Sequence, residues 1–130
     1  MERLAGSDNQ HSSVVLRIPL KVTGEYGMNK IYAGVHWSKR KKQAEEIHAL
    51  VRYELYRQKI PRKPFEKPVE IIFKYNSRLD VSNHGYLSKL IEDALKGYLI
   101  VDDSRKYVRR FVQEFWDGDG ILVEVREEGK

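Results

Sequence analysis

The stretch "VEIIFKYNSRLDVSNHGYLSKLIEDALKG", residues 69–97, sets a short apolar run directly ahead of an amphipathic helical pattern. Residues 69–75 follow a segment with three prolines and are rich in β-branched and aromatic side chains, which is typical of a strand. From about residue 83 or 84 to Lys96, apolar side chains recur at helical spacing: Leu87, Leu90, Ile91, Ala94 and Leu95. Ser82 or Asn83 can cap the start, and Gly97 fits the stop position. The stretch therefore predicts a strand followed by a helix.

The flanking sequence adds elements on both sides. Upstream, residues 13–22 read as a strand, with Pro19 favouring an edge position or a bulge. A helix is predicted from about Ser38 to about Gln58 after a long glycine-containing loop. Downstream, residues 106–116 alternate in part, and a "DGDG" turn at 117–120 leads to the alternating run 121–127. This order predicts an α/β (α+β) fold: a single domain with a mixed β-sheet, two main helices packed on it and a C-terminal β-hairpin.

Composition limits the class of protein. With 130 residues, 41% of them hydrophobic, the chain can bury one core, so we expect one domain at 14–130 after a flexible segment at 1–13. The absence of cysteine excludes a disulfide framework and a thiolate zinc site. No window reaches the roughly 20 apolar residues of a membrane helix, and no secretory signal pattern is present. We therefore expect a cytoplasmic protein.

Positive charge gathers in three places. Lys and Arg number 24 against 19 Asp and Glu, a formal net charge of +5. Basic clusters occur at 38–42, 57–63 and 104–110, and the first and third adjoin the aromatic residues Trp37 and Tyr107. Such clusters can follow a phosphate backbone while the rings stack on bases, although each cluster alone also fits a solvated helix end. The candidate DNA-contacting residues are Asn29, Lys30, His36, Trp37, Lys39, Arg40, Lys41, Lys42, Arg78, Asn83, Arg105 and Lys106.

Carboxylates stand at both ends of the predicted helix. Asp80 precedes it, where the helix dipole alone explains an acidic residue, and the pair Asp102 and Asp103 follows it. Together the three can converge on a hard cation such as Mg²⁺, which takes oxygen ligands and activates water at phosphodiesters. Lys89 on the helix would neutralise a phosphate, or would simply pair with Asp93 four residues on. The histidines lack ligand spacing, so we expect no transition-metal site.

These residues resemble a known signature. The series Asp80, Asn83, Lys89, Asp93-Ala94-Leu95, Gly97 and Asp102-Asp103 is similar to that of the RusA-type Holliday-junction resolvases, small endonucleases common in phages and prophages. The resemblance covers roughly residues 14–126, and its specific part is 80–103. It implies Mg²⁺-dependent cleavage of four-way DNA junctions by a homodimer in recombination and repair, with Mn²⁺ as an alternative ion. It also implies that Asp80, Asp102 and Asp103 hold the metal and that Lys89 is the catalytic lysine at the scissile phosphate.

One position departs from that signature. Ser82 stands where the family has its second Asp, and residues 84–86 look like an insertion ahead of Lys89. Serine is neutral and a weaker Mg²⁺ ligand than a carboxylate. The sequence therefore leaves two further hypotheses open beside the nuclease: a non-catalytic protein that binds branched DNA, and a small basic protein-interaction module.

Overall fold

A mixed sheet of four strands forms the frame of the molecule. The computed structural model describes residues 13–34 and 36–128. In chain order the elements are β1 (Ser13–Ile18), η1 (Gly24–Tyr26), α2 (Met28–Tyr32), α3 (Trp37–Arg57), β2 (Val69–Tyr75), η2 (Val81–His84), α4 (Gly85–Leu95), β3 (Val108–Phe115) and β4 (Ile121–Glu127). The strand order is β1-β4-β2-β3, with β4 antiparallel to both neighbours and β3 parallel to β2. The expected flexible segment 1–13 lies outside the described residues except for Ser13, which begins β1.

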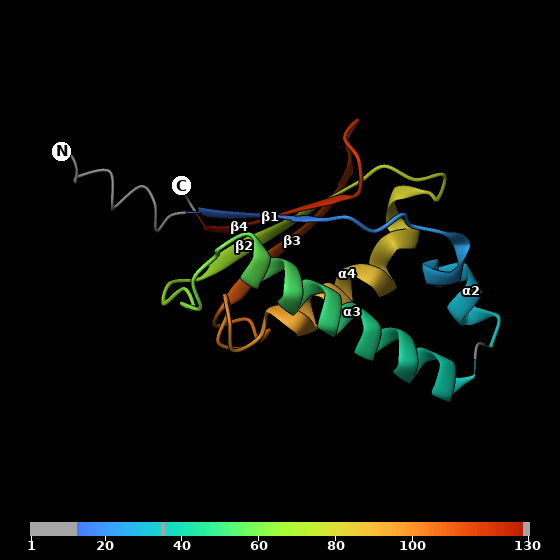
Figure 1. Cartoon of the computed structure of the whole chain (residues 1–130), viewed down its shortest axis with the longest axis horizontal. Helices are drawn as coiled ribbons and strands as arrows, with labels where there is room; N and C mark the ends of the chain where they lie inside the picture. Colours follow the sequence, from blue (N-terminus) through green and yellow to red (C-terminus); the bar gives the residue numbers. More distant parts are fainter. Residues whose placement is uncertain (1–12, 35, 129–130) are drawn as a thin grey trace.

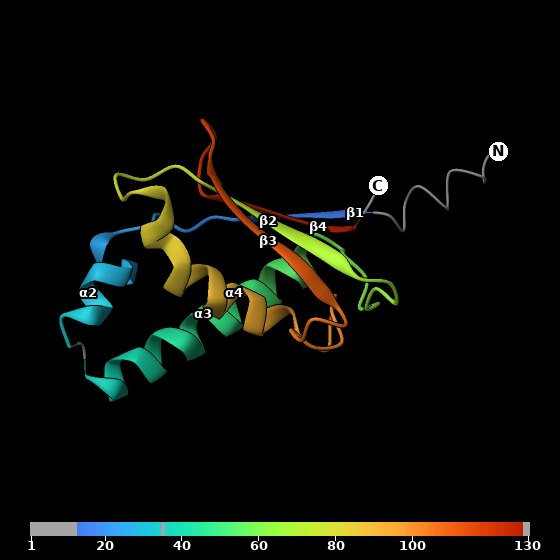
Figure 2. The same cartoon turned by 180° about the vertical axis from the view of Figure 1, so that it is seen from behind.

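Both main helices pack on the same face of the sheet (Figure 1), and the reverse view shows the other face without a helix (Figure 2). On the covered face, Val69, Ile71, Phe73 and Tyr75 of β2 are fully buried. They meet apolar side chains of α3 and α4, the residues Ile47, Val51, Leu55, Leu87, Ile91 and Leu95. This packing confirms the predicted fold class: one α+β unit in which helical and strand patterns share one core.

The C-terminal hairpin prediction was wrong. β3 and β4 are joined by the turn at 117–120, yet β2 lies between them and pairs with both. The turn crosses the end of β2, where Trp116 N donates to Tyr75 O at 3.0 Å and Asn76 Nδ2 donates to Gly118 O at 2.9 Å. A central position suits β2, because its side chains are buried on both faces, including Ile72 at 7% exposure.

The remaining boundaries follow the sequence with local differences. β1 lies at an edge of the sheet, as predicted, but it ends at Ile18, ahead of Pro19, and not at residue 22. The predicted long loop contains η1 and α2. α3 begins at Trp37, one residue ahead of the predicted start, and the His36 ring caps it by accepting from Ser38 N at 3.1 Å. α4 ends ahead of Gly97, whose φ of +75° favours glycine. Within the part of the chain that the structure describes, no helix has the length and apolar character that a membrane crossing requires.

Candidate functional site

Lys89 and Asp103 lie in direct contact. Lys89 projects from α4 with its side chain half exposed, and Asp103 comes from the loop that follows the helix. The ammonium of Lys89 makes a short ion pair with Asp103 Oδ2, and it lies 3.1 Å from Glu92 Oε1 and 3.3 Å from Asp93 Oδ1. Lys96 Nζ is 3.2 Å from both Asp93 Oδ1 and Asp103 Oδ2. Three carboxylates, hereafter the acidic cluster (Glu92, Asp93 and Asp103), therefore surround two ammonium groups.

Local chain geometry explains why Asp103 returns to the helix. Gly97 N donates to Ile100 O at 2.7 Å, and the side chains of Leu99 and Ile100 are buried. The tight turn after α4 thus anchors the chain in the core before it emerges at Asp102. Asp102 Oδ1 accepts from the backbone N–H of Asp103 at 2.8 Å, which orients the next residue. On α4 itself, the i,i+3 and i,i+4 spacings carry Glu92 and Asp93 to Lys89.

The close contacts within the cluster shift the pKa values of its residues. Hydrogen bonds from Lys89 and then Lys96 hold the pKa of Asp103 well below its usual range. Burial alone would lower the pKa of Lys89, but its hydrogen bonds to Asp103 and Glu92 and the nearby carboxylate charges outweigh burial, so that pKa is raised. Burial raises the pKa of Glu92, against the opposing effect of Lys89. Lys89 is therefore a cation at neutral pH, which suits it to contact a phosphate and not to act as a base.

The acidic cluster has the donor set of a hard-cation site. One oxygen from each of Glu92, Asp93 and Asp103 lies within 4.8 Å of the other two. Among the described residues, Asp93 Oδ1 is a buried oxygen with no hydrogen bond, because its two lysine contacts have ion-pair distances without hydrogen-bond geometry. Mg²⁺ and Mn²⁺ prefer oxygen ligands, so the residues fit either ion. The ammonium groups of Lys89 and Lys96 contact the same carboxylate oxygens, so a bound ion would compete with them for those oxygens.

The predicted carboxylate set is only partly brought together. Asp103 and Lys89 meet, as predicted. Asp102 is exposed beside Asp103, and it does not belong to the close group of oxygens. Asp80 is exposed at the start of η2, and within the described ranges its carboxylate forms no hydrogen bond or ion pair. Glu92 and Asp93 stand beside Asp103 instead, because the η2 turn separates Asp80 from α4 while helical spacing carries these two residues to Lys89.

His84, directly ahead of α4, has a structural role. His84 is fully buried, its Nδ1 lies 2.9 Å from Val81 O, its Nε2 lies 2.7 Å from Ser77 Oγ, and its ring stacks on Tyr75 with centroids 4.0 Å apart. Burial lowers the pKa of His84. Its neighbour Asn83 accepts from Asn29 N at 2.8 Å, which joins two of the predicted DNA-contacting residues. Ser82 itself is exposed.

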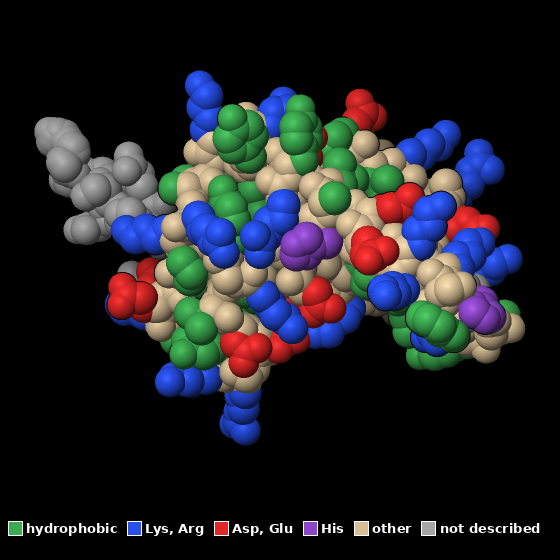
Figure 3. Space-filling view, turned by 60° about the horizontal axis from the view of Figure 1, so that its bottom comes forward, with side chains coloured by type: hydrophobic (Ala, Val, Ile, Leu, Met, Phe, Trp, Pro, Cys, Tyr) green, Lys and Arg blue, Asp and Glu red, His purple; other side chains and the backbone are tan. Residues whose placement is uncertain are grey.

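The basic residues of α3 lie beside the start of α4, and other predicted basic residues are exposed elsewhere on the molecule. Tyr86 of α4 hydrogen-bonds Gln43 at 3.0 Å, which brings the start of α3 and its exposed basic residues, Lys39, Arg40, Lys41 and Lys42, beside the start of α4. Lys39 is paired with Glu25 at 3.0 Å. His36 and Trp37 stack at 5.9 Å, and Trp37 is 63% exposed. Lys30, Arg78, Arg105 and Lys106 are exposed as well. Figure 3, which brings the helix side forward, shows Lys and Arg side chains across this face with acidic side chains among them.

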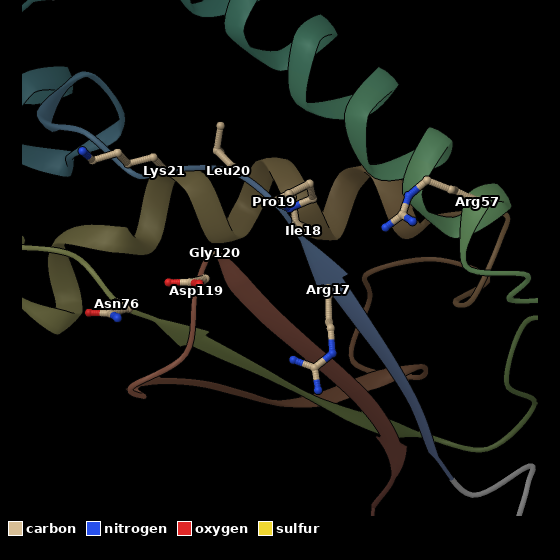
Figure 4. A pocket seen from close by; sticks show the side chains of 9 residues that line it. All are labelled: Arg17, Ile18, Pro19, Leu20, Lys21, Arg57, Asn76, Asp119 and Gly120. Atoms are coloured by element: carbon tan, nitrogen blue, oxygen red, sulfur yellow. The ribbon is translucent and has the colours of Figure 1, made fainter.

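Among the surface hollows, one lies between the two main helices and another beside β1. A groove of about 360 Å³ between α3 and α4 is lined by Lys41, Ala44, Glu45, His48, Leu90 and Asp93, so it runs from the basic part of α3 to the acidic cluster. A second pocket, of about 580 Å³, lies between β1, the end of α3 and the 117–120 turn (Figure 4). Two of its three cations are already engaged, since Arg57 pairs with Glu54 at 2.7 Å and Arg17 lies over Trp116, while Lys21 is the third. The first hollow is therefore the better candidate for a ligand path.

Glu92 and Asp93 had weaker sequence signals than Asp103. Asp93 was predicted as a helix partner of Lys89 and as part of the resolvase-like signature but not as a metal ligand, and Glu92 was not predicted at all. The i,i+3 spacing from Lys89 was the available signal for Glu92, but that spacing is common on solvated helices.

Comparison of the chain with models of known protein families finds no match, and no curated protein matches it either.

Proposed function

We propose that this protein is a Mg²⁺-dependent, structure-selective endodeoxyribonuclease of RusA type that cleaves branched DNA such as four-way junctions. The observation that carries the proposal is the contact between Lys89 and Asp103, with Glu92 and Asp93 beside them. The same lysine and aspartate carry the resemblance in the sequence. The proposal thus combines a sequence pattern with a cluster that has the required donors.

The cluster residues divide the chemical work. Asp103 and Asp93, with Glu92, would hold Mg²⁺ or Mn²⁺. The ion would supply an activated water and stabilise charge on the leaving oxygen. Lys89 donates to a non-bridging phosphate oxygen, for which its raised pKa keeps it charged. Lys89 must exchange a carboxylate partner for the phosphate, and its half-exposed side chain leaves room for that change.

The basic residues supply the binding energy for the substrate. Lys41 lines the groove that also contains Asp93, and Lys42 and Arg40 are exposed nearby on α3. A DNA backbone that follows these cations reaches the acidic cluster along the groove. Trp37 offers an exposed ring at the same end of α3, where an unpaired base at a branch point can stack.

A non-catalytic protein that binds branched DNA is the second candidate function. Two lysines already neutralise the acidic cluster, and Ser82 supplies no carboxylate. A protein of this kind would retain the basic groove and would use Lys89 and Lys96 only to maintain its fold. It would bind junctions in a salt-sensitive manner and would release no cleaved strand.

A cleavage assay separates the two functions. Purified protein is incubated with an end-labelled four-way junction and with a linear duplex of the same sequence, in Mg²⁺ or in EDTA. We expect Mg²⁺-dependent nicks in the junction and few in the duplex. Binding of the junction without nicks in Mg²⁺ or Mn²⁺ would support the binding protein, and failure to bind either DNA would reject both candidates.

A further inference from the structure

β3 is an edge strand with unpaired backbone groups. It lies outermost in the sheet, and no described strand flanks its outer side (Figure 2). The hydrogen bond from Trp116 N to Tyr75 O shows which residues of β3 face β2. Along a strand, the backbone N–H and C=O groups of alternate residues point to the same neighbouring strand. The backbone groups of the even-numbered residues from 110 onward therefore point toward β2. Phe111, Gln113 and Phe115 therefore direct their backbone N–H and C=O groups outward.

The same edge exposes two large aromatic rings. Phe111 is 40% exposed and Phe115 is 53% exposed. Both lie on the helix-covered face, because they are in register with Ile71 and Tyr75. Phe111 is continuous with the core, since its ring centroid lies 4.7 Å from that of Phe73. An apolar strip beside unpaired backbone groups is a typical site for adding another strand.

Charges on the opposite face make this edge complementary to itself. Arg110, Val112 and Glu114 share the face without helices, and Arg110 lies 3.3 Å from Glu70 while Lys74 lies 3.7 Å from Glu114. If a second β3 pairs antiparallel with Val112 on the twofold axis, Arg110 of each copy lies opposite Glu114 of the other. The charges then alternate across the junction in the order Lys74, Glu114, Arg110, Glu70.

Only one register achieves this match. In a continuous sheet the helix-covered faces of both copies lie on the same side, so odd-numbered residues of β3 must pair with odd-numbered residues and even with even. The twofold axis therefore passes through a residue of β3. An axis at Phe111 would set Arg110 opposite Val112, and an axis at Gln113 would set Arg110 opposite Trp116. The axis at Val112 also makes Phe111 a diagonal neighbour of Phe115 in the second copy, at the roughly 7–8 Å that aromatic side chains can span.

We infer that two copies of this chain associate through β3, antiparallel and with Val112 on the twofold axis, so that the two four-stranded sheets continue into one. The inference goes beyond the proposed function by assigning the dimer surface, and it does not depend on cleavage. In such a dimer both helix layers lie on the same side of the continuous sheet. Both acidic clusters therefore face the same side, which suits one branched DNA with two strands to cut.

The charge pair gives a direct experiment. The solution mass is measured by light scattering for the wild type, for Arg110→Glu, for Glu114→Arg and for an equimolar mixture of the two variants. We expect twice the chain mass of 15.3 kDa for the wild type and a dissociation constant at least about tenfold higher for each variant alone. In the mixture every opposed pair has opposite charge, so the dimer should reform.

Recovery in the mixture also shows that both variants are folded. The matched control is Arg17→Glu, the same charge reversal on the other edge strand, which should leave the dimer intact. The inference would be overturned by a monomeric wild type, by an unchanged mass in Arg110→Glu, or by a mixture that stays monomeric. Dissociation by Arg17→Glu alone would assign the interface to β1 instead.

Discussion

Lys89 stands at the centre of the site's electrostatics, because its ammonium contacts all three carboxylates of the acidic cluster. Replacing it with methionine keeps much of the apolar stem and removes the charge. We expect Lys89→Met to be less stable than the wild type without metal, since the carboxylates then repel one another. We expect it to bind Mg²⁺ at least about tenfold more tightly, because among the described residues Lys96 is then the one ammonium left beside the cluster to compete for the oxygens.

Calorimetric titration and melting curves with and without Mg²⁺ measure both effects. Lys42→Met, an equal change on an exposed part of α3, is the control and should alter neither. If Lys89→Met showed no heat of Mg²⁺ binding and no rise in Tm with the ion, the acidic cluster would not be a metal site.

His84 should give the protein a pH-dependent stability. Burial lowers its pKa from the ordinary value of 6.5. A group of this kind contributes its stabilisation above the unfolded pKa and loses it as the pH falls through the folded value. The free energy of unfolding should therefore decrease below about pH 6.5, and that part of the decrease should be absent in His84→Gln. Urea unfolding at a series of pH values measures it, and identical slopes in both proteins would contradict the role.

For individual residues, the sequence predicted the side-chain contacts that local spacing along a helix determines. Lys89 and Asp93 are four residues apart on a helix, so their contact follows from periodicity. Asp103 reached the same lysine through a turn whose course depends on the burial of Leu99 and Ile100. Asp80 was expected beside Lys89 as well. It instead lies ahead of the η2 turn, which buried His84 anchors at the start of α4.

Among the elements, α3 stabilises the end of α4 that carries the site. Arg52 of α3 donates to Ala94 O at 2.7 Å and to Lys96 O at 2.6 Å, which satisfies carbonyls at the α4 C-terminus and opposes the helix dipole. Removing it with Arg52→Met should lower the free energy of unfolding by about 1–3 kcal/mol. Chemical denaturation measures this loss, and Arg52→Lys should recover only part of it. A change below about 0.5 kcal/mol would show that water replaces the cap.

The C-terminal strands show where local patterns stop being informative. The alternation at 121–127 and the "DGDG" turn identified β4 and its entry correctly. The same turn signal appears whether the flanking strands pair directly or leave room for a third, so the hairpin was predicted where β2 intervenes. The central position of β2 is evident from the burial of its side chains on both faces. That burial is a property of the folded sheet and is not visible in a local sequence pattern.

For the whole molecule, the proposed DNA binding should be salt-dependent, because the surface that would carry it is basic. Each phosphate contact contributes about −0.9 to the slope of log affinity against log salt concentration for duplex DNA. Lys41→Gln with Lys42→Gln should therefore reduce the slope by about two. Fluorescence anisotropy with a labelled junction measures the slope, and Lys67→Gln, an exposed change in the 60–68 connection, should leave it unchanged. Equal slopes in all three proteins would remove α3 from the interface.

If Asp103 belongs to a cluster that hydrolyses branched DNA, as we propose, cleavage should require its carboxylate. The rate of Mg²⁺-dependent nicking of a synthetic four-way junction is compared for wild type, Asp103→Asn and the exposed turn variant Asp119→Asn. We expect equal rates for wild type and Asp119→Asn and a rate lower by at least about 100-fold for Asp103→Asn. Nicking by Asp103→Asn at the wild-type rate would contradict the proposal.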